Sequence, residues 1–321
     1  MQTTTDVRLA ACSADPAAVY RAAVYRAAGP GADAGEILES GAWLVVPPGV
    51  ADQRAQALLA RTARFSEGRE HRGRRAAAQA LMPGPAGARE TARILTARAV
   101  AGAGPLLDAM PVARHVPVAA LAGCLGIPGD TCDRVAALVG RLCDASAPSL
   151  LPRPPGDGLG NVPAELAAVS AAACGSPSAG EAAVGLMFQA RDATAGLVGS
   201  ALLRAGDPGG PGGPGHPERT VEETLRRDSP VQATTRVRAG SGDPPVTAWV
   251  ILATGDAAPG IAATFGRGRH ACPGHAVAAA LACGVLDAFG EAGWQAVPGQ
   301  SVGYEPRPNL RVPHQVLLAR A

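Results

Sequence analysis

Lysine is absent from this chain of 321 residues, and all 29 of its basic residues are arginine. Without lysine the sequence cannot contain the G-x-x-x-x-G-K-[ST] loop, so this type of phosphate-binding site is excluded. The 27 acidic residues leave a formal net charge of +2, which is too small to indicate nucleic acid or an anionic membrane as a partner. The absence of lysine, with abundant alanine, glycine and proline, suggests a bacterial source with a GC-rich genome.

Aromatic side chains are also scarce, at 3% of the residues, so the core must be built from Ala, Val and Leu. No uninterrupted apolar run approaches the roughly eighteen residues of a membrane span. The first residues lack the basic and apolar regions of a secretory signal. The seven cysteines are dispersed without a C-x-x-C pair. Such a set is typical of reduced thiols, and we expect a cytoplasmic protein.

The hydrophobic pattern predicts a mainly helical protein with a minor strand component. With 47% hydrophobic residues, the chain can bury the core of one large domain or two small ones. Helical spacing is present over 16–28, 50–63, 73–103 with a break near 83, 116–145 with a break at 127–129, 179–204, 218–228 and 276–292. Short strands are expected within 41–49 and 245–256, and Pro and Gly place loops at 147–163 and 206–217.

The densest group of chemically active side chains lies in residues 265–275, FGRGRHACPGH. Zinc is poorly supported, because His270, Cys272 and His275 lack a fourth ligand at a suitable spacing. A simple turn around a buried thiol would account for the cysteine and the glycines alone. A haem accounts for more, since Cys272 precedes a helix N-terminus, where backbone amides favour a thiolate, and Phe265 supplies an apolar shield.

The glycines and cations of this loop also suit a flat, anionic ligand. Gly266 and Gly268 allow a tight turn whose backbone can approach a planar molecule, and Gly274 lets the next helix do the same. His270 and the loop arginines supply positive charge for an anionic edge. A haem ligated by Cys272, with its propionates beside His270, explains each of these features.

The run from Phe265 to Gly274 resembles the cysteine-ligand loop of the cytochrome P-450 superfamily, F-G-x-G-x-H-x-C-x-G. Glu223-Thr-Leu-Arg226 is similar to the E-x-x-R helix of that family, where the two charged residues form a buried structural ion pair. EGREHRGRR is similar to the H-x-x-x-R helix, and it contains His71 and Arg75. Each short pattern alone is an ordinary pair one turn apart. Their order along the chain, together with the cysteine loop, gives a resemblance over nearly the whole length.

The resemblance implies one cytochrome P-450-like domain over residues 1–321, mainly α with minor β and reduced in size, with a flexible start at 1–14. It implies a haem b whose iron is bound by Cys272, and small-molecule oxidation. The implied haem contacts are His71, Arg75, Arg236, Phe265, His270, Cys272 and Gly274. A small-molecule substrate and an electron donor of the ferredoxin and ferredoxin reductase type are the implied partners. The segment between Arg238 and Phe265 is shorter than in the family, which puts ordinary docking of such a donor in doubt.

The helix at 179–204 departs from the acid–threonine pair that relays protons in the family. One alignment keeps Asp192 as the acid and places Ala193 at the threonine. The other keeps Thr194 as the hydroxyl and loses the acid. Arg191 either binds a substrate carboxylate over the iron or points to solvent or a neighbouring element. We therefore treat Arg191, Asp192 and Thr194 as the candidate catalytic residues.

These departures leave three hypotheses open. The first is haem-thiolate oxidation of a small molecule in bacterial specialised metabolism. The second is haem chemistry without the usual O2 and electron supply, either driven by peroxide or a non-redox cyclisation, rearrangement or dehydration. The third is a non-catalytic descendant that binds haem or another ligand.

Overall fold

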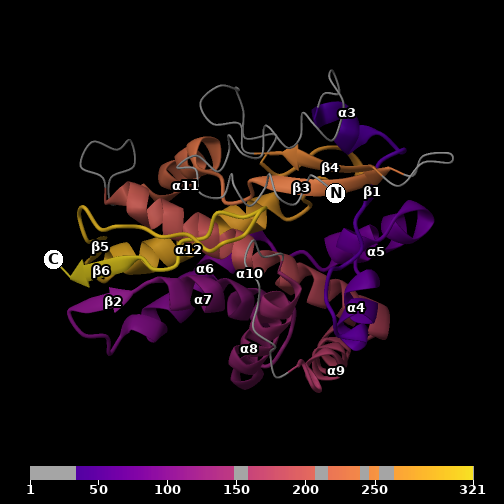
Figure 1. Ribbon diagram of the computed structural model, residues 1–321. Helices are drawn as coiled ribbons and strands as arrows, with labels where there is room; N and C mark the ends of the chain where they lie inside the picture. The colour runs from indigo at the N-terminus through magenta and orange to yellow at the C-terminus, as the bar shows by residue number, and fades with distance from the viewer. Residues whose placement is uncertain (1–33, 148–157, 207–215, 239–245, 253–263, 321) are drawn as a thin grey trace.

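The computed structural model describes residues 34–147, 158–206, 216–238, 246–252 and 264–320 (Figure 1). The expected helix at 16–28, the start at 1–14 and most of the loops at 147–163 and 206–217 lie outside these residues. Helices make up 61% of the structure, so the prediction of a mainly helical protein with minor strands is confirmed.

The helices of the described part follow the apolar periodicity, and prolines stand near the start of several of them. Pro85 is at the start of α6, and Pro177 is at the start of α10, where the Ser176 hydroxyl accepts from the Ala179 amide at 3.2 Å. The bounds are α3 Ala34–Glu39, α4 Gln53–Ala60, η1 Ala63–Phe65, α5 Gly68–Ala80, α6 Pro85–Val100, α7 Met110–Cys124, α8 Gly129–Ser146, α9 Val162–Cys174, α10 Pro177–Ala205, α11 Pro217–Arg227, η4 Gly268–His270 and α12 His275–Glu291.

Two small antiparallel sheets complete the described fold. One has the strand order β1-β3-β4 and the other β2-β6-β5. Their bounds are β1 Leu44–Val45, β2 Leu106–Asp108, β3 Ala233–Arg238, β4 Val246–Ile251, β5 Trp294–Ala296 and β6 Leu317–Arg320. In the first sheet Val45 lies opposite Arg236. This register places the β1 backbone beside the backbone of Arg236.

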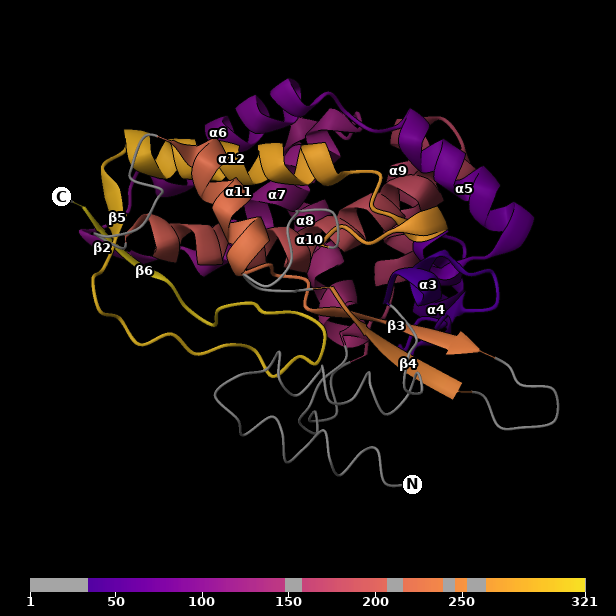
Figure 2. The ribbon, with the colours of Figure 1, turned by 90° about the horizontal axis from the view of Figure 1, so that it is seen from above.

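Helix α10 runs through the middle of the molecule and contacts α5, α7, α8, α9, α11 and α12 (Figures 1 and 2). One of its faces is lined by glycines at which other segments approach closely. A Cβ at Gly185 would lie 2.9 Å from Thr62, one at Gly196 would lie 2.7 Å from the Arg311 carbonyl, and one at Gly199 would lie 2.8 Å from Met110. We call Gly185, Gly196 and Gly199 the glycine face of α10.

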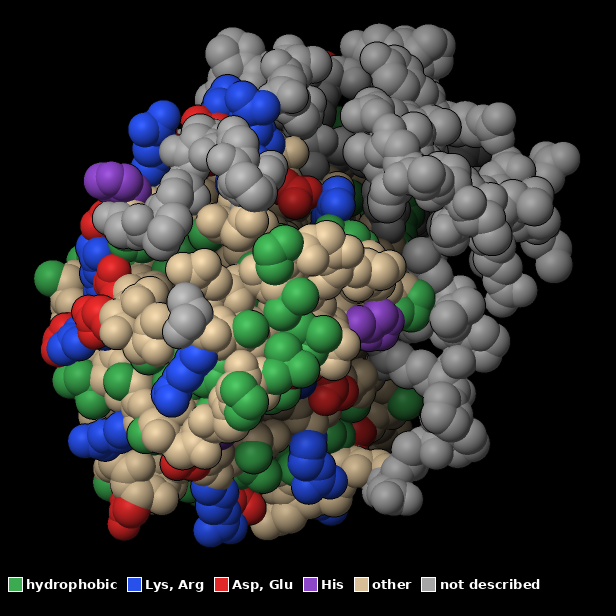
Figure 3. Space-filling view, turned by 90° about the vertical axis from the view of Figure 1, so that its left-hand side faces the viewer, with side chains coloured by type: hydrophobic (Ala, Val, Ile, Leu, Met, Phe, Trp, Pro, Cys, Tyr) green, Lys and Arg blue, Asp and Glu red, His purple; other side chains and the backbone are tan. Residues whose placement is uncertain are grey.

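Helix α12 packs along α6 and against α10, α7 and α11. By length and composition alone, residues Gly268–Glu291 could cross a membrane, with a mean hydropathy of 1.4 over the most apolar window and half of that window buried. Because α12 packs against four other helices, its apolar character is that of a core helix. At the end of the molecule formed by the β2-β6-β5 sheet, exposed hydrophobic side chains lie among charges of both signs (Figure 3), and Leu106 is 55% exposed.

Several elements differ from the sequence prediction. The expected strand at 41–49 has only two residues in β1, because two prolines follow it at Pro47 and Pro48. Helices α3 and α9 and the strands β2, β3, β5 and β6 were not predicted, since these segments are short or have little periodic contrast between apolar and polar positions. The expected break near residue 83 and the break at 127–129 both separate helices in the structure.

Candidate functional site

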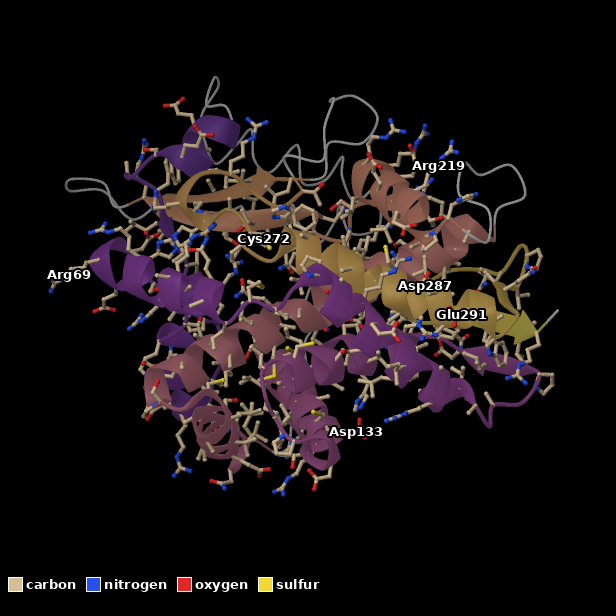
Figure 4. All side chains as sticks on the ribbon, turned by 180° about the vertical axis from the view of Figure 1, so that it is seen from behind. Arg69, Asp133, Arg219, Cys272, Asp287 and Glu291 are labelled. Carbon is tan, nitrogen blue, oxygen red and sulfur yellow. The ribbon has the colours of Figure 1, made fainter. Side chains whose placement is uncertain are left out.

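The cysteine loop folds back on itself immediately before α12. Gly266 and Gly268 have φ angles of 71° and 67°, which non-glycine residues rarely adopt. The Cys272 amide donates to the Phe265 carbonyl at 2.8 Å, and the Ala271 amide donates to the Gly268 carbonyl at 3.0 Å. Figure 4 shows Cys272 where this loop meets the N-terminal end of α12. The loop therefore holds one thiol in a defined position.

The Cys272 thiol is half-buried. Burial raises its pKa, while a backbone hydrogen bond at Gly274 and the nearby guanidiniums of Arg75 and Arg64 oppose that rise. A thiol in this setting is protonated on its own and becomes a thiolate when a metal ion binds it. Among the described residues, no three His, Cys, Asp and Glu side chains converge as ligands for a metal ion, so zinc lacks a ligand set there.

Helix α5 contributes an arginine and a histidine to the surroundings of the loop. The Arg75 guanidinium donates to the Ala271 carbonyl at 2.7 Å, and the ring of His71 lies 4.1 Å from the ring of His270, centroid to centroid. His71 and Arg75 are four residues apart on the same helix face. The structure thus places both residues beside the cysteine loop.

Arg236 enters the same region from β3. It is only 3% exposed, yet among the described residues it donates to neutral oxygens alone, the Thr234 hydroxyl at 3.0 Å and the Thr235 carbonyl at 2.9 Å. Burial, with repulsion from Arg64 and Arg269, lowers its pKa to about 10. The guanidinium stays charged at neutral pH, and a buried charge of this kind needs an anion.

Arg64, on η1, is a cation that sequence reasoning missed. Its guanidinium lies 5.6 Å from the centroid of the Phe65 ring, and no carboxylate of the described residues pairs with it. Burial lowers the pKa of Arg64, and the proximity of Cys272 opposes this shift. No family pattern or spacing marks this position, so only the fold could identify it.

His270 has a buried ring nitrogen without a well-formed partner among the described residues. Its Nε2 lies 3.3 Å from Glu67 Oε1, a long contact for a hydrogen bond. Burial, with repulsion from His71, lowers the pKa of His270 to about 4. The ring is therefore neutral at neutral pH and has a polar atom available for a ligand.

These residues fit a haem by their charge. We call Arg64, His71, Arg75, Arg236, Arg269 and His270 the cationic cluster. Within the described part of the chain, Glu67 is the one carboxylate that bonds to any of them. The four arginines and the single acid leave a surplus of three positive charges. Two propionates would neutralise most of this surplus, as buried charges require, and a Cys272 thiolate would balance the positive charge of a ferric porphyrin.

The remaining two residues of the expected haem loop lie on either side of Cys272. The Phe265 ring packs on the core beside α12, with its centroid 5.8 Å from that of His275. A Cβ at Gly274 would lie 3.4 Å from the Met82 side chain. Both positions are compatible with a ligand bound at Cys272. The Phe265 ring would be its apolar neighbour, and the backbone at Gly274 could approach it closely.

On α10, Arg191 and Asp192 belong to a network of ion pairs. The Arg191 guanidinium contacts Asp144 of α8 at 2.6 Å and Asp192 at 3.0 Å. The second Asp192 oxygen pairs with Arg307, which also contacts Glu305 at 2.5 Å. Both Asp192 oxygens therefore accept from guanidiniums. Of the two alternatives for Arg191, these contacts favour pairing with a neighbouring element.

A different face of α10 is accessible in the middle of this otherwise buried helix. Leu186, Gln189, Ala190 and Ala193, spaced by three or four residues, are half-buried or exposed. Thr194 is adjacent to this stripe and buried, and its hydroxyl has no hydrogen-bond partner in the described residues. Ala193 therefore occupies the accessible face, without a hydroxyl, while Asp192 points to the ion pairs.

The Glu223–Arg226 pair forms, at 2.6 Å, and Arg227 also contacts Glu223 at 3.0 Å. The expected burial of this pair is wrong, because the side chains of Glu223 and Arg226 are 19% and 38% exposed. The amphipathic α11 turns Val221 and Leu225 inward, and this orientation leaves the charged positions between them near the surface.

A groove in the described part of the structure lies elsewhere, between α6, α11 and α12, with a volume of about 580 Å³. Its floor is apolar, and its rim is formed by ion pairs such as Arg89–Asp287, at 2.7 Å. Phe265 and His275 reach its wall, but Cys272 does not line it. The groove is therefore separate from the cationic cluster.

No family model and no curated relative matches this chain. Solved structures do match. P450BioI in complex with hexadec-9Z-enoic acid ligated acyl carrier protein superposes with a TM-score of 0.69 at 15% identity, covering 96% of this chain and 99% of that one. CalO2 matches with a TM-score of 0.65 at 18% identity, covering 90% and 89%. The open cytochrome P-450 Eryk from S. erythraea matches with a TM-score of 0.64 at 19% identity, covering 90% and 88%.

The helical architecture, with a cysteine loop before its last long helix, thus defines a class of fold. It is the cytochrome P-450 fold, and this chain has it in shortened form. The fold prediction from the cysteine loop is confirmed.

Proposed function

We propose that this chain is a haem-thiolate enzyme of the cytochrome P-450 type that oxidises a small molecule. The observation that supports this most is the surplus of positive charge beside one thiol, contributed by α5, η1, β3 and the cysteine loop. When bound, a haem b would supply the oxidising chemistry, and a thiolate ligand favours cleavage of an O–O bond.

In this proposal each part of the site has one task. Cys272 Sγ binds the iron, and the loop backbone keeps it in place through the Phe265 carbonyl. His71, Arg75, Arg236 and His270 hold the propionates, and Arg64 adds a further cation. The apolar Phe265 ring excludes water from the sulfur side, which protects a thiolate from protonation. Ala190 and Ala193 leave room for a substrate along α10.

A second candidate is haem chemistry without the usual O2 and electron supply, either peroxide-driven or a non-redox cyclisation, rearrangement or dehydration. The observation that favours it is the occupied carboxylate of Asp192, with alanine at the neighbouring accessible position. A carboxylate held by two guanidiniums is poorly placed to pass protons to a bound ligand. The substrate or water would then have to supply that proton.

The partners follow from the same proposal. They are a small-molecule substrate and, for the first candidate, a ferredoxin with its reductase, in the cytoplasm of a bacterium with specialised metabolism. One similar structure contains a fatty acid on an acyl carrier protein, so substrates linked to a carrier belong in the panel alongside free ones.

The first prediction concerns the haem ligand. We expect the purified protein to bind one haem b and to show the red-shifted ferrous–CO band of a thiolate haem. Cys272→Ala should abolish this band, because no other described cysteine lies in the cationic cluster. Cys124→Ala, at a half-buried thiol on α7, is the matched control and should retain it. Stoichiometric zinc in place of haem would contradict the proposal.

The two candidate functions separate in turnover trials. Product formation with a reductase system and NAD(P)H supports the ordinary oxidation. Product formation with peroxide alone, or with neither oxidant nor reductant, supports the second candidate. Substrate-induced shifts of the haem spectrum identify the compounds to test.

A further inference from the structure

Arg269 lies between Gly268 and His270 of the cysteine loop and joins this loop to two other segments. Its Nε donates to Glu67 Oε2 at 3.0 Å, and a terminal nitrogen lies 3.3 Å from Glu67 Oε1. The same guanidinium donates to the carbonyls of Ser40 at 2.8 Å and Trp43 at 2.5 Å. Arg269 therefore links the turn before β1, the residue before α5 and the cysteine loop.

Glu67 lies where an unpaired carboxylate would interfere with the cationic cluster. Its Oε1 accepts from the Val45 amide at 2.8 Å, and Val45 lies opposite the buried Arg236 in the sheet. The same oxygen is 3.3 Å from His270 Nε2. Burial alone would raise the pKa of Glu67, but the hydrogen bonds from Arg269 and the Val45 amide hold it below its ordinary value.

Glu67 and a haem propionate are thus chemically equivalent anions near the same two groups, the charged Arg236 and the neutral ring of His270. Two carboxylates that compete for one guanidinium and one ring nitrogen repel each other. A guanidinium with several donors can hold one carboxylate and two carbonyls at once. Arg269 does this on the side of Glu67 that faces the cysteine loop.

We propose that Arg269 is a positioning residue that occupies Glu67 and so leaves His270 and Arg236 available to the haem carboxylates. The inference rests on the proposed function, because it assumes that a haem binds at Cys272. This positioning role and a purely structural role of Arg269 predict different results. If Arg269 supports haem retention by pairing with Glu67, then removing the charge of Glu67 makes Arg269 dispensable for haem retention.

The test is a double-mutant cycle on the haem-loaded protein, read as the rate of haem transfer to an excess of an apoprotein acceptor. Arg269→Gln is expected to release haem about tenfold faster than the wild type, and Arg269→Gln/Glu67→Gln to return within about threefold of it. Glu67→Gln alone should retain haem at least as well as the wild type, since the amide oxygen can still accept from Val45. Arg69→Gln, at an exposed arginine at the outer end of α5 (Figure 4), is the control.

Several outcomes would overturn the inference. The inference is wrong if Arg269→Gln retains haem as well as the wild type does. It is also wrong if the double variant loses haem as fast as Arg269→Gln alone. Arg269→Lys keeps a charge beside Glu67 but loses the fork to the two carbonyls. It should release haem no more than about threefold faster. A loss equal to that of Arg269→Gln would assign the effect to the carbonyl contacts instead. A wild-type protein without a thiolate haem spectrum would refute the proposed function, and this inference with it.

Discussion

Gly268 illustrates how a single residue shapes the candidate site. Its φ is 67°, and a Cβ there would lie 2.8 Å from the Leu38 carbonyl. Gly268→Ala should therefore destabilise the protein by about 1–3 kcal/mol, because both the backbone conformation and the close approach of α3 oppose a side chain. Denaturant unfolding measures the change.

Gly73 provides the control for that substitution. It lies within α5, is exposed, and has no atom within 4 Å of an added Cβ. Gly73→Ala should stabilise the protein by about 0.5–1 kcal/mol, because alanine is the better helix former. Equal effects of the two substitutions would show that the loop does not require glycine at 268.

Ala193 carries a second prediction at the residue scale. Because both oxygens of Asp192 accept from arginines, adding a hydroxyl by Ala193→Thr should not restore a proton relay. We expect no rise in product on the native substrate, measured together with NAD(P)H consumption. A large rise with tighter coupling would identify an impaired but ordinary monooxygenase.

At the scale of single residues, sequence reasoning reached the cysteine loop because its side chains are adjacent along the chain. His71, Arg75 and Arg236 came from the family resemblance, and the structure brings all three to the cationic cluster. Arg64 and Glu67 were missed, since half-buried charged residues outside a motif look like any surface charge in a sequence. Only their neighbours in space distinguish them.

Among the elements, α10 is tied to the chain's C-terminal part by the ion pairs of Arg307. The side chains of Arg307 and Asp192 are 10% and 11% exposed, so breaking the pair leaves one oxygen of Asp192 without a partner and with little water around it, while Arg191 still holds the other. Arg307→Gln should cost about 1–3 kcal/mol of unfolding free energy. Asp192→Asn in the Arg307→Gln background should cost much less than it does alone.

Arg93 is the exposed counterpart for this comparison. It pairs with Glu90 and Glu291, whose side chains are 54% and 56% exposed. Arg93→Gln should change the unfolding free energy by less than about 1 kcal/mol, because solvent screens such pairs. Similar losses for Arg93→Gln and Arg307→Gln would show that the α10 network contributes no more than surface pairs.

Sequence reasoning found the helices at this scale more readily than the strands. Periodic apolar residues over ten or more positions indicated α8, α10 and α12. Strands of three or four residues, such as β2 and β6, carry too few alternations to be recognised. The partners of Asp192 were also out of reach, because Arg307 is 115 positions away and no periodicity connects them.

At the scale of the whole molecule, the proposed function makes the bound haem a source of stability. The cationic cluster collects like charges from α5, η1, β3 and the cysteine loop, and their mutual repulsion opposes folding of the haem-free protein. Haem binding should raise the melting temperature, with a stabilisation of about 4 kcal/mol when free haem is a thousandfold above its dissociation constant.

Haem dimethyl ester tests the origin of that stabilisation. It keeps the iron and the porphyrin but removes both propionate charges, so we expect it to raise the melting temperature clearly less than haem does. Parallel thermal unfolding of the two loaded proteins measures this difference. Equal shifts would show that the cations do not act through the carboxylates.

The glycine face of α10 limits how this chain can diverge. Any side chain at Gly185, Gly196 or Gly199 would displace Thr62, the Arg311 carbonyl or Met110. Replacements on this face therefore need simultaneous changes in the segments that cross it, and such paired changes are rare. In a set of natural variants, we expect α10 to stay nearly invariant there. Differences in substrate preference should instead accumulate in the crossing segments, which can vary one residue at a time.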